Sequence, residues 1–248
     1  MKKYILNYLP FYGVSIFLLS NLLAMYYYPG GSLFDNESVG YDFFRNFLSQ
    51  LGRVKAYVTD ANGNQLSNMI SFRIWTSGMA TSGLIFVIYY TFLPFFFDKQ
   101  KLSIIASGFG VIAGLCFVLT GITPFDIFVH LTDEQGNIIN VIKMLEVHSF
   151  FANNIFYFAF PSALIYSYLI YKSNKIDKIY GIGYYSFSIL IFFYILILVF
   201  GPNPFESESA MMFQVVSQKI IALSWVTSTL ILSLGINKSK YSSVNNCK

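Results

Sequence analysis

The stretch Ile179–Phe200, IYGIGYYSFSILIFFYILILVF, decides the class of this protein. It contains no charged side chain, and about 20 residues at roughly 1.5 Å each are enough for a helix to cross the hydrocarbon core of a bilayer. Hydrophobic residues make up 55% of the 248 residues and charged residues only 11%, whereas a soluble domain has about 25% charged residues. The chain is therefore expected to be an integral membrane protein.

Five further apolar stretches of similar length predict five more membrane-spanning helices, because a spanning segment must satisfy its own backbone hydrogen bonds. The sequence thus predicts an all-α membrane protein, a six-transmembrane-helix bundle that forms a single domain over residues 1–248. The predicted helices lie near residues 8–28, 70–97, 102–124, 148–171, 179–200 and 212–235. The first is too long for a cleaved signal peptide and is expected to remain as an anchor.

The loops alternate in charge, which predicts the orientation. One set carries ten Lys residues against two acids, and the other carries six cations against ten acids. Because Lys-rich short loops stay in the cytoplasm, both the N and C termini are expected on the cytoplasmic side of the plasma membrane. The net charge of +4 follows from this topology, so no nucleic acid partner is expected.

Two long loops, 29–69 and 125–147, lie on the predicted external side. Each contains a similar polar turn, YVTDANGNQL (Tyr57–Leu66) in the first and HLTDEQGNII (His130–Ile139) in the second. Gly in such a turn tolerates a positive φ, so the pattern predicts two small external β-hairpins. Whether the two hairpins pair with each other is left open.

The stretch YDFFRNFLSQLGR (Tyr41–Arg53) has the spacing of a helix with one apolar face. The apolar side chains on this face are Phe43, Phe44, Phe47, Leu48 and Leu51. The pattern predicts an amphipathic helix that lies at the outer membrane interface.

Polar side chains gather near the predicted outer ends of the helices. Those expected to line an outward-facing pocket are Arg45, Ser49, Arg73, Asp126, His148 and Gln218. Within this set, the candidate ligand-binding residues are Arg45, Arg73 and Gln218, and the candidate catalytic residues are Ser49, Asp126 and His148. Because the pocket would open beside the outer leaflet, the expected ligand is a lipid headgroup or a lipid-linked molecule, and membrane lipids are the expected partners.

Three classes of function remain open at this stage. Lipid binding or a structural, accessory role comes first, and no cofactor is expected for it. A membrane-embedded lipid hydrolase is the alternative, with either a Ser/His/Asp set or a zinc ion bound by Asp126 and His148. Catalytic zinc usually has three protein ligands, however, and the chain has only two His residues and no H-x-x-x-H pair.

A small-molecule transporter is the second alternative. Ion and proton pathways usually place charged side chains deep in the spanning segments, and these helices carry none away from their ends. The pair Gly110 and Gly114 is explained more simply by close helix packing.

Four short stretches resemble a known family. They are RNFLSQLGR (Arg45–Arg53), GITPFD (Gly121–Asp126), VHSFFAN (Val147–Asn153) and FQVVSQKIIALSWV (Phe213–Val226). They look like the uncharacterised prokaryotic six-helix membrane proteins catalogued as domain of unknown function 998. The resemblance implies this topology in a bacterial or archaeal membrane, and it implies no established activity. The chain departs from the family pattern at Gln50, where Asp is favoured, and by an insertion between Asp126 and His148.

Overall fold

The computed structural model describes residues 2–98, 100–132, 135 and 138–239. Its long helices are α1 (Lys2–Tyr26), α2 (Met69–Phe92), α3 (Lys101–Ile122), α4 (Met144–Lys172), α5 (Lys178–Phe200) and α6 (Glu208–Lys238). A short 3-10 turn, η2 (Leu93–Phe95), extends α2. Within the described residues, five helices, all except α4, are long and apolar enough to cross a membrane. The chain therefore has the helices of a multi-pass membrane protein.

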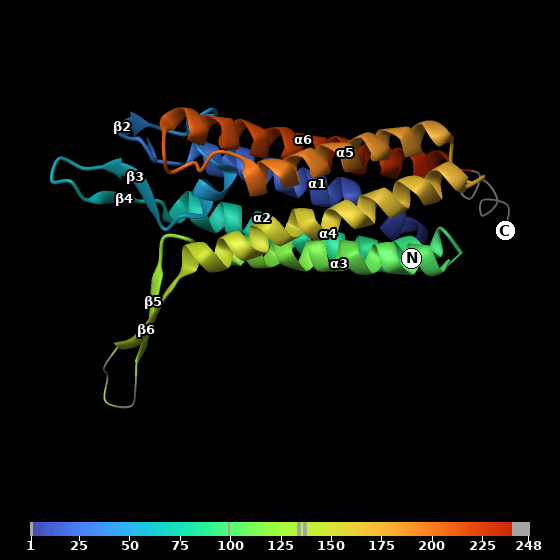
Figure 1. The fold of residues 1–248 in the computed structure, drawn as a ribbon, viewed down its shortest axis with the longest axis horizontal. Coiled ribbons are helices and arrows are strands. Elements are labelled where there is room, and N and C mark those ends of the chain that lie inside the picture. The colour runs from blue at the N-terminus through green and yellow to red at the C-terminus, as the bar shows by residue number, and fades with distance from the viewer. Residues whose placement is uncertain (1, 99, 133–134, 136–137, 240–248) are drawn as a thin grey trace.

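The six long helices form a closed ring (Figure 1). Each helix packs against the next in sequence, and α6 returns to pack against α1. Large apolar side chains also point away from the ring, among them Leu22 on α1, Leu115 on α3 and Phe193 on α5. Helices that are apolar on all sides are typical of a bundle surrounded by lipid.

Helices α2 and α3 approach each other closely because glycines face each other between them. A Cβ atom on Gly83 would lie 2.6 Å from Val118 Cγ2, and one on Gly114 would lie 2.9 Å from Val87 Cγ2. Gly114 thus serves close helix packing, as its spacing with Gly110 indicates. Two helices surrounded by lipid have no hydrophobic driving force between them. Close packing of this kind then supplies much of the attraction between the helices.

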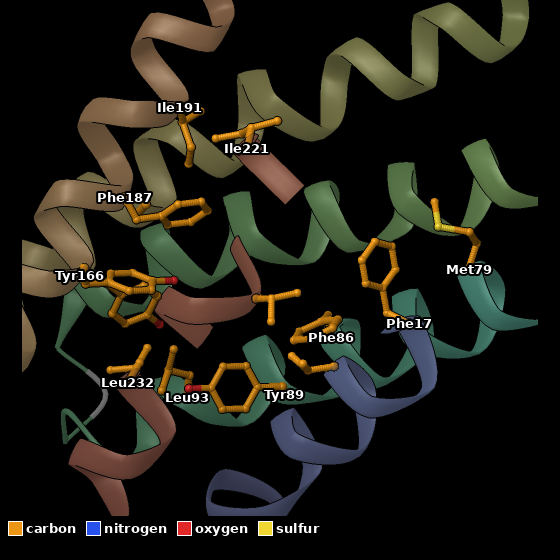
Figure 2. Close-up of a cluster of buried hydrophobic side chains, with 14 of the residues drawn as sticks. Phe17, Met79, Phe86, Tyr89, Leu93, Tyr166, Phe187, Ile191, Ile221 and Leu232 are labelled. Carbon is orange, nitrogen blue, oxygen red and sulfur yellow. The ribbon is translucent and has the colours of Figure 1, made fainter. Parts of the chain in front are cut away.

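Large side chains fill the interior of the ring toward the end where α1 begins and α6 ends. Figure 2 shows Tyr89, Leu93, Tyr166 and Leu232 clustered there, and all four are fully buried. The Tyr166 hydroxyl donates a hydrogen bond to the Ser103 carbonyl at 3.0 Å. This end of the bundle is therefore closed by packed aromatic and aliphatic groups.

Three β-hairpins project from the other end of the bundle (Figure 1). Their strands are β1 (Gly30–Ser32) with β2 (Asp35–Val39), β3 (Lys55–Thr59) with β4 (Gln65–Ser67), and β5 (Phe128–Thr132) with β6 (Ile138–Lys143). Each pair is antiparallel and forms a separate two-stranded sheet. The two hairpins predicted from the polar turns are present and do not pair with each other. Most of the β5–β6 turn lies outside the described residues.

The β1–β2 hairpin was not predicted, so the expected number of two external hairpins was too low. Its strands are short and polar, and they lack the apolar alternation that marks a strand. Glycine makes it possible, because Gly31 has φ +77° and its Cβ would lie 2.2 Å from the Val58 backbone nitrogen. The backbone of β1 therefore lies directly against β3.

The predicted amphipathic helix over Tyr41–Arg53 was wrong. Only a 3-10 turn, η1 (Leu48–Gly52), forms there. The reason is that the Asn46 carbonyl, which an α-helix would pair with the Gln50 N–H, accepts hydrogen bonds from the Tyr41 hydroxyl (2.8 Å) and from Lys219 Nζ (2.6 Å). The Gln50 N–H instead donates to the Phe47 carbonyl at 3.1 Å, which gives a 3-10 turn.

The contact between α2 and α3 predicts a position-specific effect of alanine. Gly83→Ala should lower the free energy of unfolding by about 1–3 kcal/mol, because its Cβ meets the Val118 backbone. Gly108→Ala on α3 is the control, since a Cβ there has nothing within 4 Å. Thermal unfolding of the purified protein in mild detergent measures both. Equal unfolding temperatures for the two variants would contradict the close crossing.

Candidate functional site

A cavity of about 540 Å³ lies inside the ring, toward the hairpin end. Its walls come from all six helices and are mostly apolar. Examples from different helices are Phe17, Met79, Phe117, Phe156, Ile191 and Trp225. Figure 2 shows Phe17 from α1, Met79 and Phe86 from α2, and Ile191 from α5 pointing into the ring. The deep part of the cavity therefore suits a hydrocarbon group.

The outer part of the cavity is polar. Its polar side chains include Ser49, Gln50, Arg53, His148, Asn153, Gln214 and Gln218. They come from η1 and its neighbours, from the start of α4 and from the start of α6. An apolar interior with a few polar groups gathered at one end is the usual form of a site for an amphiphilic molecule.

The segment Phe47–Lys55 covers this polar end, and side chains from separate elements hold it in place. Gln218 Oε1 on α6 accepts a hydrogen bond from the Leu48 backbone N–H at 2.8 Å. Asn68 Nδ2 donates to the Leu51 carbonyl at 3.2 Å and to the Arg53 carbonyl at 2.9 Å. This segment is called the cap below. Because the cap has little regular secondary structure, these side chains satisfy backbone groups that a helix would pair internally.

Asn46, the residue just before the cap, is fully buried. Its Nδ2 donates to Gln50 Oε1 and to the Gly31 carbonyl, both at 2.7 Å. Its own carbonyl accepts a hydrogen bond from Lys219 Nζ on α6 at 2.6 Å. Lys219 is only 4% exposed, and its ammonium group lies 4.8 Å from the centroid of the Phe43 ring. The chain just before the cap is thus attached to α6 through a buried lysine.

The structure brings three of the six predicted site residues to the cavity: Ser49, His148 and Gln218. Arg45 instead forms ion pairs with Asp42 (3.0 Å) and Glu208 (2.6 Å) on the outer surface. Arg73 is exposed on α2 and does not line the cavity.

Asp126 binds the cap rather than the cavity. One carboxylate oxygen accepts the Val54 backbone N–H at 3.0 Å, and the other accepts the Lys55 N–H at 2.8 Å. Both oxygens therefore hold the strand that follows η1. Asp126 links the end of α3 to the cap, just as Gln218 links α6 to it.

His148 is buried in the cavity wall between two aromatic rings. The centroid of its ring lies 5.2 Å from that of Phe125 and 6.4 Å from that of Trp75. Its Nδ1 lies 2.8 Å from the Thr123 carbonyl, to which it donates in the matching tautomer. Across the described chain, no hydrogen bond joins Ser49, Asp126 and His148 to one another. The described residues also contain no group of three His, Cys, Asp or Glu side chains placed to hold a metal ion.

Arg53 is the cavity residue that the sequence did not single out. It lines the polar end and is only 8% exposed. Its guanidinium carbon lies 3.9 Å from the centroid of the Tyr57 ring and 5.3 Å from that of Phe125. Burial raises the pKa of Tyr57 and the nearby guanidinium opposes this shift in part, so the ring is a neutral phenol at physiological pH. No sequence signal separates Arg53 from Arg45, because tertiary packing alone buries it.

Side chains of both α4 and α5 line the cavity. Helix α4 crosses the bundle obliquely, beside α3 at the hairpin end and toward α5 at the other end (Figure 1). The side chains over 151–156 and 158–160 of α4 are half-buried, whereas most of those over 162–170 are buried. Phe156 and Tyr194 mark where the two helices meet, with ring centroids 4.6 Å apart. Both residues also line the cavity.

No family model, curated protein or solved structure matches this chain. The resemblance to domain of unknown function 998 stays a prediction. The function is therefore inferred from the geometry of the cavity and its cap.

The contacts of Asp126 predict a structural effect of its removal. Asp126→Ala should lower the free energy of unfolding by about 1 kcal/mol, because two backbone N–H groups lose a charged acceptor. Glu37→Ala is the matched control, since Glu37 is exposed and its carboxylate forms no hydrogen bond in the described part of the chain. Thermal unfolding should separate the two variants by a few degrees. An Asp126→Ala protein as stable as the control would show that the carboxylate does not hold the cap.

Proposed function

We propose that this protein binds a membrane lipid, with an acyl chain in the cavity and the headgroup at the polar end under the cap. The observation that carries this proposal is the form of the cavity, which is apolar in its depth and polar at one end. Its volume of about 540 Å³ lies within the range of roughly 300–1,000 Å³ typical of ligand sites. The proposed route of entry is sideways from the bilayer between α4 and α5, where the α4 side chains over 151–156 and 158–160 are half-buried rather than buried.

The closed end of the bundle favours binding over transport. Tyr89, Leu93 and Tyr166 are fully buried beyond the deep end of the cavity, and Tyr90 and Tyr184 hydrogen-bond across the interior at 3.1 Å between hydroxyls. A cavity that ends in packed side chains holds a ligand without passing it across the membrane. The backbone contacts of Asp126 and His148 give no specific support to hydrolysis.

We further propose that α4 is a sixth membrane span. It has 29 residues, and at about 1.5 Å per residue it is long enough to cross. Its polar side chains His148, Ser149 and Asn153 line the cavity, which explains how a helix of lower hydropathy fits a bundle surrounded by lipid. With six spans and Lys-rich loops inside, both termini lie in the cytoplasm, and the cap faces outward from the plasma membrane.

The orientation is tested by thiol labelling in whole cells, in a background where Cys247 is replaced by Ser and Cys116 stays buried. A cysteine in place of Ala61, at the exposed tip of the β3–β4 hairpin, should react with a membrane-impermeant maleimide in intact cells. A cysteine in place of Asn174, exposed between α4 and α5, is the control and should react only after permeabilisation. The reverse pattern would overturn the orientation.

Filling the cavity should remove the bound lipid. Ala222 on α6 lines the cavity, so Ala222→Trp places an indole where the acyl chain would lie. Leu223→Trp is the matched control, because Leu223 is the next residue and is 56% exposed on the outer face of the ring. Each protein is purified in mild detergent, and the lipid carried along is quantified by mass spectrometry.

The expected result is about one tightly bound lipid per chain in wild type and in Leu223→Trp, and a large loss in Ala222→Trp. A control variant and a filled variant that carry the same amount of lipid would contradict the proposal. So would a wild-type protein that retains none. Circular dichroism of both tryptophan variants confirms that they remain helical.

A further inference from the structure

We propose that Arg53 binds an anionic headgroup, so that the ligand of the cavity is a lipid carrying a phosphate or a carboxylate at its polar end. This inference rests on the proposed lipid-binding function and names the chemical class of the ligand. It depends on the contacts of one buried cation at the polar end of the cavity.

Arg53 keeps most of its hydrogen-bonding capacity free. A guanidinium group has five N–H donors, and the Nε–H of Arg53 donates to the Lys55 carbonyl at 2.8 Å. The four donors on Nη1 and Nη2 find no acceptor among the described residues, and neither nitrogen is enclosed by protein atoms. The donors that suit a bidentate contact with an anion therefore remain available.

The charge of Arg53 is also uncompensated by an ion pair in the described part of the chain. The nearby carboxylate of Asp126 is engaged by the backbone N–H groups of Val54 and Lys55. A buried charge is costly unless a counter-charge or hydrogen bonds accompany it. The Tyr57 and Phe125 rings beside the guanidinium supply part of this compensation through cation–π contacts. An anion supplied by the ligand would supply the rest.

The surroundings of Arg53 fit a headgroup rather than a free ion. Ser49, Gln218 and His148 line the same polar end and offer neutral polar groups. Trp75 lines the cavity as well, and its buried Nε1–H has no acceptor in the described structure. Below these groups the walls are apolar, so the site offers an anion position and a hydrocarbon position together.

In a bilayer, the headgroup and not the acyl chain decides which lipid the cavity selects. Moving an acyl chain from lipid into an apolar cavity gains little, because the bilayer is already as apolar as the cavity walls. Selectivity must then come from polar contacts, and a bidentate contact between Arg and a phosphate or carboxylate is among the strongest of these. Lys is a weaker substitute because it lacks the planar fork and stacks less well on aromatic rings.

The test is competitive binding of defined amphiphiles to the purified full-length protein in mild detergent, followed by native mass spectrometry. The probes are phosphatidylglycerol, oleic acid and uncharged diacylglycerol. Wild type should prefer phosphatidylglycerol or oleic acid over diacylglycerol by about tenfold or more, as expected for a hydrogen bond to a charged group. Which of the two anions binds better distinguishes a phosphate-headed lipid from a fatty acid.

The variants are Arg53→Gln, Arg53→Lys and the control Arg73→Gln. Arg53→Gln removes the cation and should abolish the preference, while Arg53→Lys should retain part of it. Arg73→Gln makes the same substitution at an exposed side chain on α2 that does not line the cavity, and it should behave as wild type. If Arg53→Gln does not fold, the role of Arg53 is decided by two results. They are the preference of wild type for the anionic amphiphiles over diacylglycerol, and the reduction of that preference in Arg53→Lys.

The outcomes separate this inference from the proposed function. Equal binding of diacylglycerol and both anions by wild type would overturn the role of Arg53 while leaving lipid binding intact. The same conclusion would follow from an unchanged preference in a folded Arg53→Gln protein. Binding of none of the three amphiphiles would overturn the proposed function itself.

Discussion

The structure depends on one constraint. The backbone N–H and C=O groups of an irregular segment at the hairpin end of the helical ring must find hydrogen-bond partners. The cap, Phe47–Lys55, has only one 3-10 turn, so its N–H and C=O groups need partners from elsewhere. Gln218, Asn68 and Asp126 provide them from three separate parts of the chain. These bonds fix the cap relative to α6, α2 and the end of α3. The polar end of the cavity therefore keeps one geometry only while these elements stay together.

This arrangement explains why a buried cation is tolerated beside an apolar cavity. The cap carries Arg53 inward, where the Tyr57 and Phe125 rings and the Lys55 carbonyl stabilise it on one side. The other side of the guanidinium faces open space in the cavity. A site of this kind is preorganised for an anion, because the cost of burying the cation has already been met in folding. Binding then requires little rearrangement of the protein.

The sequence predicted the helices well because their apolar runs are long and unambiguous. The predicted span near 179–200 matches α5, Lys178–Phe200, and the span near 148–171 lies within α4, Met144–Lys172. Predictions at the hairpin end were weaker, since the Tyr41 hydroxyl and Lys219 Nζ take up the Asn46 carbonyl that the predicted helix would have paired internally. Three of the residues that the sequence singled out, Ser49, His148 and Gln218, line the cavity. Arg53 was not singled out, because only tertiary contacts distinguish a buried arginine from an exposed one.

Photo-crosslinking with a lipid that carries a diazirine at the end of its acyl chain tests the central claim most directly. The label is activated in membranes that contain the protein, and the modified peptides are mapped by mass spectrometry. Insertion of an acyl chain into the ring predicts labels on inward-facing residues such as Phe117, Ala222 and Trp225, which line the cavity. Labels confined to outward-facing residues such as Leu115 and Leu223 would show that the chain stays in the bilayer, and would contradict the account.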